Sequence, residues 1–372
     1  MKNILTLLTA TVISITLIGQ VSSKTMDDHG NLPTGIISSK VLPDLQFQKE
    51  NEWKSYGPYG GDVLDLAISP GNPGLSFAAA GYPYSRTGID EDWAIVENLL
   101  SLSPSGIHCF EYTSGNVLLA GGNLNYGKIL RSTDDGASWT QKIVPYNGGI
   151  LDIAVDPSNP DLAYAGLSSN ISVSQNEVIA YTENAGELWS LWDMTSILPV
   201  GWGCVDVEVD PGDSQTIFAI GNESFSNAKV IATFDGGATW QDVTSNLPSG
   251  KPLNALAIHD SNVYIGGGQL FGGNFLGLYK SDDYGTSWQN ISASFPNKVI
   301  NDILINPDDA GNMFVATEGD GIYYTTDGGS NWVFDTPGAG DNGSARCIRL
   351  LPGDPSTVFA GFLSLGVNYS SD

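Results

Sequence analysis

One eight-residue pattern, Ser/Thr-x-Asp-x-Gly-x-Ser/Thr-Trp, recurs along the chain and constrains its fold more than any other feature. In its first copy, Asp134 is placed to accept hydrogen bonds from backbone N–H groups, and Gly136 suits a position with positive φ. Trp139 then opens the next strand as a large apolar anchor. The copies are Ser132–Trp139, Thr233–Trp240, Ser281–Trp288, Thr325–Trp332 and, in worn form, Thr182–Trp189. They predict five tight turns, each joining two strands.

The tryptophans extend this pattern into a repeat that covers most of the chain. Seven of the nine fall 40 to 51 residues apart: Trp53, Trp93, Trp139, Trp189, Trp240, Trp288 and Trp332. Each unit opens with an apolar or alternating strand, followed by a Pro/Asn/Gly turn and a second strand. The clearest first strands are Val63–Ile68 and Ile150–Val155. Seven such strands at this spacing are typical of propeller blades.

The two ends of the chain complement each other. Gly366–Asp372 aligns with Gly321–Asp327, so the last unit stops at the Asp of a further box, before its Trp and outer strand. The first unit begins with an orphan outer strand at Trp53. We therefore predict that the N-terminal strand completes the last blade and closes the ring, which leaves no open sheet edge. The alternative is that the chain is a fragment of a longer protein.

The eight-residue repeat is the Asp-box, or BNR, repeat, and the chain resembles the Asp-box β-propellers. That group includes sialidases, xyloglucanase-like glycoside hydrolases, sortilin-type receptor domains and the photosystem II assembly factors. The resemblance implies an all-β fold, a seven-bladed β-propeller of four-stranded antiparallel blades. It also implies that the box aspartates are structural, on the face opposite the usual ligand-binding face: Asp134, Asp235, Asp283 and Asp327.

The net charge limits the expected partners, and the N-terminal residues predict the location. A net charge of −26 disfavours nucleic acid and anionic membrane surfaces. Residues 1–23 resemble a secretory signal peptide, with Lys2 ahead of an apolar run and small residues before Lys24. Residues 24–52 form a polar arm, and residues 53–372 form the propeller. We expect a secreted or periplasmic monomer that is not inserted in a membrane.

The cysteines and histidines do not predict a metal site or a cofactor. Cys109, Cys204 and Cys347 lie in apolar strands, and an odd count argues against a disulfide framework, so we expect buried thiols. The three histidines are too dispersed for zinc-ligand spacing.

One column of residues has two interpretations. The third position of the first strands is occupied in turn by Asp65, Cys109, Asp152, Asp206, Ala255, Asp302 and Cys347. Because first strands line the axial channel of a propeller, the four aspartates could form an acidic ring that holds a cation. Alternatively, each Asp caps the turn entering its own strand, with backbone N–H groups as partners.

The catalytic sets of the related enzymes are not matched. A sialidase needs an arginine triad and a tyrosine nucleophile, whereas the chain has four arginines, of which Arg346 and Arg349 share one strand. Xyloglucanase-like enzymes use two carboxylates. Their Arg-Thr-Asp segment is replaced by Arg86-Thr-Gly88, so we assign no catalytic residue.

Binding candidates lie on the loops between second and third strands and between units, where a propeller places its variable residues. Exposed aromatic residues there suit sugar stacking or a protein contact. The predicted ligand-binding residues are Tyr82, Tyr84, Tyr126, Trp202, Phe271 and Phe275. The sequence thus favours a non-enzymatic binding or scaffold propeller that recognises a protein or polysaccharide, with a glycoside hydrolase as the alternative.

Overall fold

A computed structural model describes most of the chain from Trp53 onward. The described ranges are 53–55, 57–58, 61–102, 106–122, 127–146, 148–169, 176–223, 227–269, 273–295, 297–335 and 343–371. The predicted signal peptide (1–23) and polar arm (24–52) lie outside the described residues, as do Tyr126 and Phe271.

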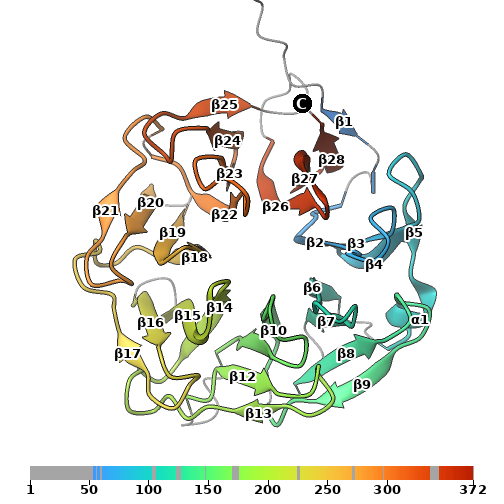
Figure 1. The fold of residues 1–372 in the computed structure, drawn as a ribbon, viewed down its shortest axis with the longest axis horizontal. Helices are drawn as coiled ribbons and strands as arrows, with labels where there is room; N and C mark the ends of the chain where they lie inside the picture. The colour runs from blue at the N-terminus through green and yellow to red at the C-terminus, as the bar shows by residue number, and fades with distance from the viewer. Residues whose placement is uncertain are drawn as a thin grey trace, which may run out of the picture. The chain divides into compact units, whose positions relative to one another are not determined.

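The described residues form seven four-stranded antiparallel sheets, arranged around a common axis as the blades of a propeller (Figure 1). This confirms the predicted all-β, seven-bladed fold. The innermost strands are β2 (Asp65–Ile68), β6 (Ile107–Tyr112), β10 (Ile150–Val155), β14 (Trp202–Asp210), β18 (Leu253–His259), β22 (Ile300–Ile305) and β26 (Ala345–Leu351). They open blades 1 to 7 in that order.

The remaining strands follow outward within each blade. The second strands are β3 (Ser76–Ala80), β7 (Leu118–Gly122), β11 (Ala163–Leu167), β15 (Asp213–Glu223), β19 (Asn262–Gln269), β23 (Met313–Thr317) and β27 (Asp354–Phe362). The third strands are β4 (Tyr82–Arg86), β8 (Lys128–Ser132), β12 (Ile179–Thr182), β16 (Lys229–Thr233), β20 (Asn274–Ser281), β24 (Gly321–Thr325) and β28 (Gly366–Ser370). The outer strands are β5 (Ala94–Ile95), β9 (Thr140–Ile143), β13 (Ser190–Leu191), β17 (Gln241–Asp242), β21 (Gln289–Asn290), β25 (Val333–Asp335) and, in blade 7, β1 (Lys54–Ser55).

The N-terminal strand closes the ring as predicted. β1 pairs antiparallel with β28, with Lys54 opposite Tyr369 and Ser55 opposite Asn368. Blade 7 is therefore built from both ends of the propeller, in the order β1-β28-β27-β26. This pairing gives blade 7 the outer strand that its C-terminal segment lacks.

The apolar core lies between neighbouring blades. Phe77 of blade 1 packs against Phe110 of blade 2, with ring centroids 5.6 Å apart, and both rings are buried. Burying a ring of this size stabilises the fold by about 2 to 3 kcal/mol. The three cysteines are buried and unbridged, as expected from their apolar strands.

The Asp-box turns join third and outer strands, and their bonds recur from blade to blade. In blade 2, Asp134 Oδ1 accepts a hydrogen bond from the Ser138 amide (2.8 Å), and Ser132 Oγ accepts one from the Gly136 amide (2.9 Å). The equivalent amide-to-carboxylate bonds form at Asp235, Asp283 and Asp327. Gly136 has φ 81°, and a Cβ there would lie 2.5 Å from Phe77 Cζ, so only glycine fits.

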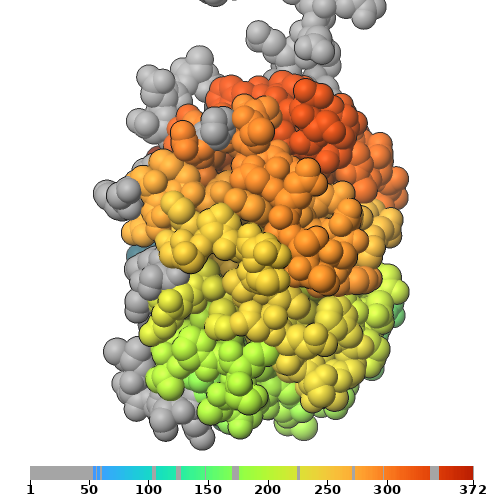
Figure 2. Space-filling view, turned by 90° about the vertical axis from the view of Figure 1, so that its left-hand side faces the viewer, coloured from blue at the N-terminus to red at the C-terminus, as the bar shows by residue number. Residues whose placement is uncertain are grey.

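The strand order fixes which loops share a face. Because each blade is a four-stranded antiparallel meander, box turns lie at the same end as the turns between first and second strands. The loops between second and third strands and the inter-blade loops lie at the opposite end, called the loop face here. Figure 2 shows the rim, where successive blades follow one another from green to red. The one described helix, α1 (Glu97–Leu100), connects blades 1 and 2, and no helix among the described residues is long and apolar enough to cross a bilayer.

Candidate functional site: the axial channel and the rim groove

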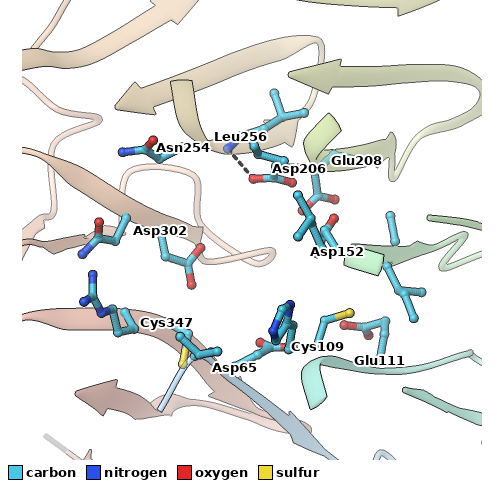
Figure 3. Close-up of a pocket in the computed structure, with 18 of the residues that line it drawn as sticks. Asp65, Cys109, Glu111, Asp152, Asp206, Glu208, Asn254, Leu256, Asp302 and Cys347 are labelled. Atoms are coloured by element: carbon cyan, nitrogen blue, oxygen red, sulfur yellow. Dashed lines mark hydrogen bonds between the residues drawn. The ribbon is translucent and has the colours of Figure 1, made fainter. Parts of the chain in front are cut away.

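The innermost strands carry charged residues into the axial channel, around a cavity of about 380 Å³ (Figure 3). Six of these strands contain a β-bulge. In five strands it lies between the first residue and the third, for example between Ile150 and Asp152, and in β14 it lies between Cys204 and Asp206. Four residues after the start of the bulge, three strands carry a charged residue that also lines this cavity: Glu111, Glu208 and Arg349. The channel cluster, as used below, consists of Asp65, Glu111, Asp152, Asp206, Glu208, Asp302 and Arg349.

The four channel aspartates link each blade to the next. Each accepts a hydrogen bond from a backbone amide in the first strand of the following blade. These bonds are Phe110 N to Asp65 (2.8 Å), Val207 N to Asp152 (3.1 Å), Leu256 N to Asp206 (2.7 Å) and Ile348 N to Asp302 (2.7 Å). The capping interpretation was therefore right about backbone N–H partners. Asp302 also accepts a hydrogen bond from the amide of Ile303 in its own strand (2.8 Å), so the amides of the neighbouring blade add to own-strand partners rather than replace them.

Arg349 neutralises one side of the channel. Its guanidinium contacts Asp302 of blade 6 (2.8 Å) and Asp65 of blade 1 (2.5 Å), and it also donates to the Ile348 carbonyl. Desolvation nevertheless raises the pKa of the Asp65 carboxyl, with Arg349 opposing the shift.

The other side of the channel has no cation among the described residues. Burial raises the pKa of Glu111 to about 8 and that of Asp152 to about 7, and neighbouring carboxylates add to both shifts. Burial and the Asp152 charge also raise the pKa of Asp206 and Glu208 well above their usual range. No hydrogen bond joins the Glu208 carboxylate to a described residue. These groups hold protons near neutral pH.

The channel does not present metal-binding geometry. Among the residues that the structure describes, no group of three or more His, Cys, Asp or Glu side chains is arranged to hold a metal ion. The acidic ring is also interrupted at Cys109, Ala255 and Cys347.

A second recess lies on the loop face, between blades 3, 4 and 5. It consists of two adjoining hollows of about 630 and 160 Å³ that share Asn227, Ala228 and Thr244. We call it the rim groove. Its remaining lining residues are Ser196, Ile197, Leu198, Pro199, Lys229, Asp242, Leu247, Pro248, Ser249, Gly250, Lys251, Leu253 and Leu276.

Comparisons with known proteins agree with this architecture. A family model described as "Sortilin, neurotensin receptor 3" matches residues 277–361. A solved GH74 xyloglucanase from Xanthomonas campestris superposes with a TM-score of 0.66 at 17% identity, over 85% of this chain and 53% of that one. YCF48 from Cyanidioschyzon merolae superposes with a TM-score of 0.63 at 17% identity, over 86% of this chain and 98% of that one. The chain is an Asp-box β-propeller.

Curated relatives of this Asp-box propeller include xyloglucanases. A probable oligoxyloglucan-reducing end-specific xyloglucanase from Neosartorya fischeri is 29% identical over 143 residues, which is 35% of this chain and 17% of that protein. Xyloglucanase Xgh74A from Acetivibrio thermocellus is 27% identical over 186 residues, 44% of this chain and 21% of that protein. The matched region thus spans about a fifth of the length of these relatives.

The predicted ligand-binding aromatics that the structure describes lie in three different blades. Tyr82 is 53% exposed at the start of β4, whereas Tyr84 is half-buried against the blade 1–blade 7 core. Phe275 is half-buried on β20, in blade 5. Trp202 is 1% exposed within the core, so the expectation of an exposed ring is wrong there. It starts β14 and packs inward rather than standing on a loop.

Sequence reasoning missed two features of the Asp-box propeller. Glu111, Glu208 and Arg349 follow Cys109, Asp206 and Cys347 by two residues, where other blades have Ala or Leu, and that contrast could have revealed them. The rim groove is framed by a repeated segment, Thr-Ser-x-Leu-Pro, at Thr195–Pro199 and Thr244–Pro248. Its recurrence in two consecutive inter-blade loops was the available signal.

Proposed function

We propose that this Asp-box propeller is a non-enzymatic binding or scaffold module that recognises a protein or polysaccharide through its loop face. The blades supply a rigid ring, and the loops differ from blade to blade while the boxes repeat. A rigid scaffold with variable loops on one face is a common arrangement for recognition.

The observation that carries the proposal is how the charged channel residues are used. The four aspartates accept blade-to-blade amide bonds, and Arg349 holds two of them. The other arginines are also engaged: Arg131 with Glu187, Arg346 with Asp62 and Glu318, and Arg86 with the Ile89 carbonyl. These groups therefore serve the scaffold, which leaves recognition to the loops.

The comparisons support binding by a fold of this size. A solved YCF48 bound to D1 peptide shares the fold at a TM-score of 0.61 and 16% identity, and this chain covers 98% of it. A protein of similar fold and size can therefore bind a peptide.

Paired glycan and peptide arrays, probed with the purified protein, test the proposal. We expect saturable binding to one class that weakens when the exposed Tyr82 is changed to alanine, or when loop-face residues at another blade are changed. The matched control is Phe334→Ala, because Phe334 is similarly exposed but lies on the outer strand β25. Absence of saturable binding on both arrays would overturn the proposal.

A glycoside hydrolase is the second candidate, and Glu111 favours it. With a pKa of about 8, its carboxyl is protonated at neutral pH, as a general acid requires. Reducing-sugar release from xyloglucan and a β-glucan panel tests this directly. Activity that Glu111→Gln abolishes would support hydrolysis, and no release from any substrate would eliminate it.

We also propose that the protein acts outside the cytoplasm as a secreted or periplasmic monomer. The signal-like segment before Lys24 supports export. N-terminal sequencing of the exported protein should begin near Lys24, and light scattering should give the monomer mass. An uncleaved cytoplasmic product or a stable dimer would contradict the corresponding part.

A further inference from the structure

We propose that the rim groove between blades 3, 4 and 5 binds an extended peptide segment that carries an aliphatic side chain next to a carboxylate. This inference rests on the proposed binding function and names its site and partner chemistry. It stands on the shape, composition and charge of the groove, each described below.

The two hollows of the groove are adjacent and are held by the fold. They share Asn227, Ala228 and Thr244, so an extended segment that crosses these residues would reach both. Thr244 is fixed because its hydroxyl accepts a hydrogen bond from the Val230 amide at 2.9 Å. The walls therefore stand preformed, which reduces the ordering cost of binding.

The walls of the groove are aliphatic. Leu198 is buried in the core next to blade 4, and Ile197 packs against the same core. Leu247 packs against the core between blades 4 and 5, where Leu276 is buried. Ile197 and Leu247 are half-buried, so they present aliphatic surface to an occupant while the core anchors them from behind, which suits one apolar side chain of a peptide.

The lining of the groove includes a lysine that can pair with a carboxylate. Its ionisable lining residues are Lys229, Asp242 and Lys251, in a chain of net charge −26. Lys229 is paired with Asp242, whereas Lys251 forms no hydrogen bond or ion pair with a described residue. Glu223 is next to the groove, where its carboxylate accepts a hydrogen bond from the lining residue Asn227. Lys251 is thus the lining cation that complements a carboxylate of the occupant.

The lining favours a peptide over a glycan. None of the described lining residues has an aromatic ring on which a sugar face could stack. Ser196 and Ser249 are exposed, and their hydroxyls form no hydrogen bond with a described residue. They can therefore bond to the backbone of an extended segment.

Panning a random heptapeptide phage library on the purified protein, followed by fluorescence anisotropy of the enriched peptides, tests the inference. We expect enriched peptides to combine Asp, Glu or a free C-terminus with a neighbouring Leu, Ile or Val. Ser196→Trp and Ser249→Trp should each fill one hollow and weaken binding at least tenfold. Both serines are exposed, so the fold should tolerate these substitutions.

The charge is tested by Lys251→Glu, which should weaken binding about tenfold, with an affinity that falls as salt rises. Lys128→Glu is the matched control, because Lys128 is also half-buried, its side chain forms no hydrogen bond or ion pair with a described residue, and it begins β8 in blade 2. It should leave binding within twofold. Peptides that bind wild type and all three groove variants equally would rule out the groove as the binding site while leaving the proposed function intact. Failure of both this library and the glycan array would overturn both.

Discussion

Two sides of the axial channel carry ionisable residues of opposite kind, an arginine and a glutamate, at the same position of the innermost strand. Arg349, the fifth residue of β26, lies between Asp302 of the preceding blade and Asp65 of the following blade. Glu111 is the fifth residue of β6 and interacts with Asp65 of the preceding blade and Asp152 of the following one. One position supplies a cation to two carboxylates, and the other adds a third carboxylate.

The difference shows that hydrogen bonding and charge balance are separate constraints in this ring. On both sides, aspartates keep their amide bonds to the next blade. On the Arg349 side these carboxylates also find a counter-charge, whereas on the Glu111 side desolvation and mutual repulsion raise the pKa values. The scaffold therefore accommodates carboxyls that are protonated near neutral pH on the Glu111 side of the ring.

The largest expected effect is that of Arg349→Ala, which removes the counter-charge from Asp65 and Asp302. Asp65 is 9% exposed and Arg349 32% exposed, so the loss should destabilise the protein by about 3 kcal/mol at pH 7. Urea denaturation measures this. Lys142→Ala is the control, since its partner Glu187 is 48% exposed and an exposed pair contributes about 0.5 kcal/mol. Equal losses would show that burial in the channel adds nothing to the ion pairs of Arg349.

Next in size is the pH dependence that the Glu111 side imposes. A carboxyl whose pKa rises from 4.5 to about 8 on folding holds a proton that the unfolded chain releases above pH 4.5. Stability should therefore fall as pH rises from about 5 to 8, by at most about 1.4 kcal/mol per pH unit for each such group, and then level off. Glu111→Gln should flatten this slope and stabilise the protein by about 2 kcal/mol at pH 8. Urea midpoints at four pH values measure both, and an unchanged slope would remove Glu111 from the cluster's titration.

A smaller effect should separate two aspartates with the same backbone bond. Asp302→Asn keeps an acceptor for the Ile348 amide but loses its charge-assisted contact with Arg349, which should cost about 1.5 kcal/mol. Asp206→Asn keeps an acceptor for the Leu256 amide and replaces a carboxyl whose pKa is already raised, so it should change stability by less than about 0.5 kcal/mol. The difference at pH 7 is the informative quantity. Similar destabilisation by the two variants would mean that the amide bond alone determines how much each aspartate stabilises the fold.

The sequence predicted the fold well because the fold depends on a repeated local pattern. The Asp-box turns form through residues at most six positions apart, and the Trp53 strand could be assigned by comparing one unit with the next. Comparing one repeat with the next needs no knowledge of long-range packing. The amide partners of Asp152 and Asp206 could not be read in the same way, because they lie 55 and 50 residues further along, in another blade.

The sites were harder to predict because they depend on which side chains the ring brings together. Trp202 looked like a loop aromatic, yet the start of β14 carries it into the core. Nothing in the sequence marks Lys251 or Ala228 as a binding residue. They line the same groove only because blades 4 and 5 pack together. Local patterns predict turns, whereas recesses between blades require the assembled ring.

The smallest expected effect is that of Asp134→Asn, which changes an aspartate outside the axial channel. Asp134 is an exposed box carboxylate whose pKa is lowered by hydrogen bonds from Ser138 and Ser132, so it titrates in acid, well below the range in which the channel cluster loses protons. Asn184 already fills the equivalent place in blade 3 and accepts the Leu188 amide bond at 2.8 Å. The variant should therefore shift Tm by no more than about 1 °C and leave the pH 5 to 8 slope unchanged. A reduced slope, measured by the same urea series, would show that the slope does not report on the channel alone.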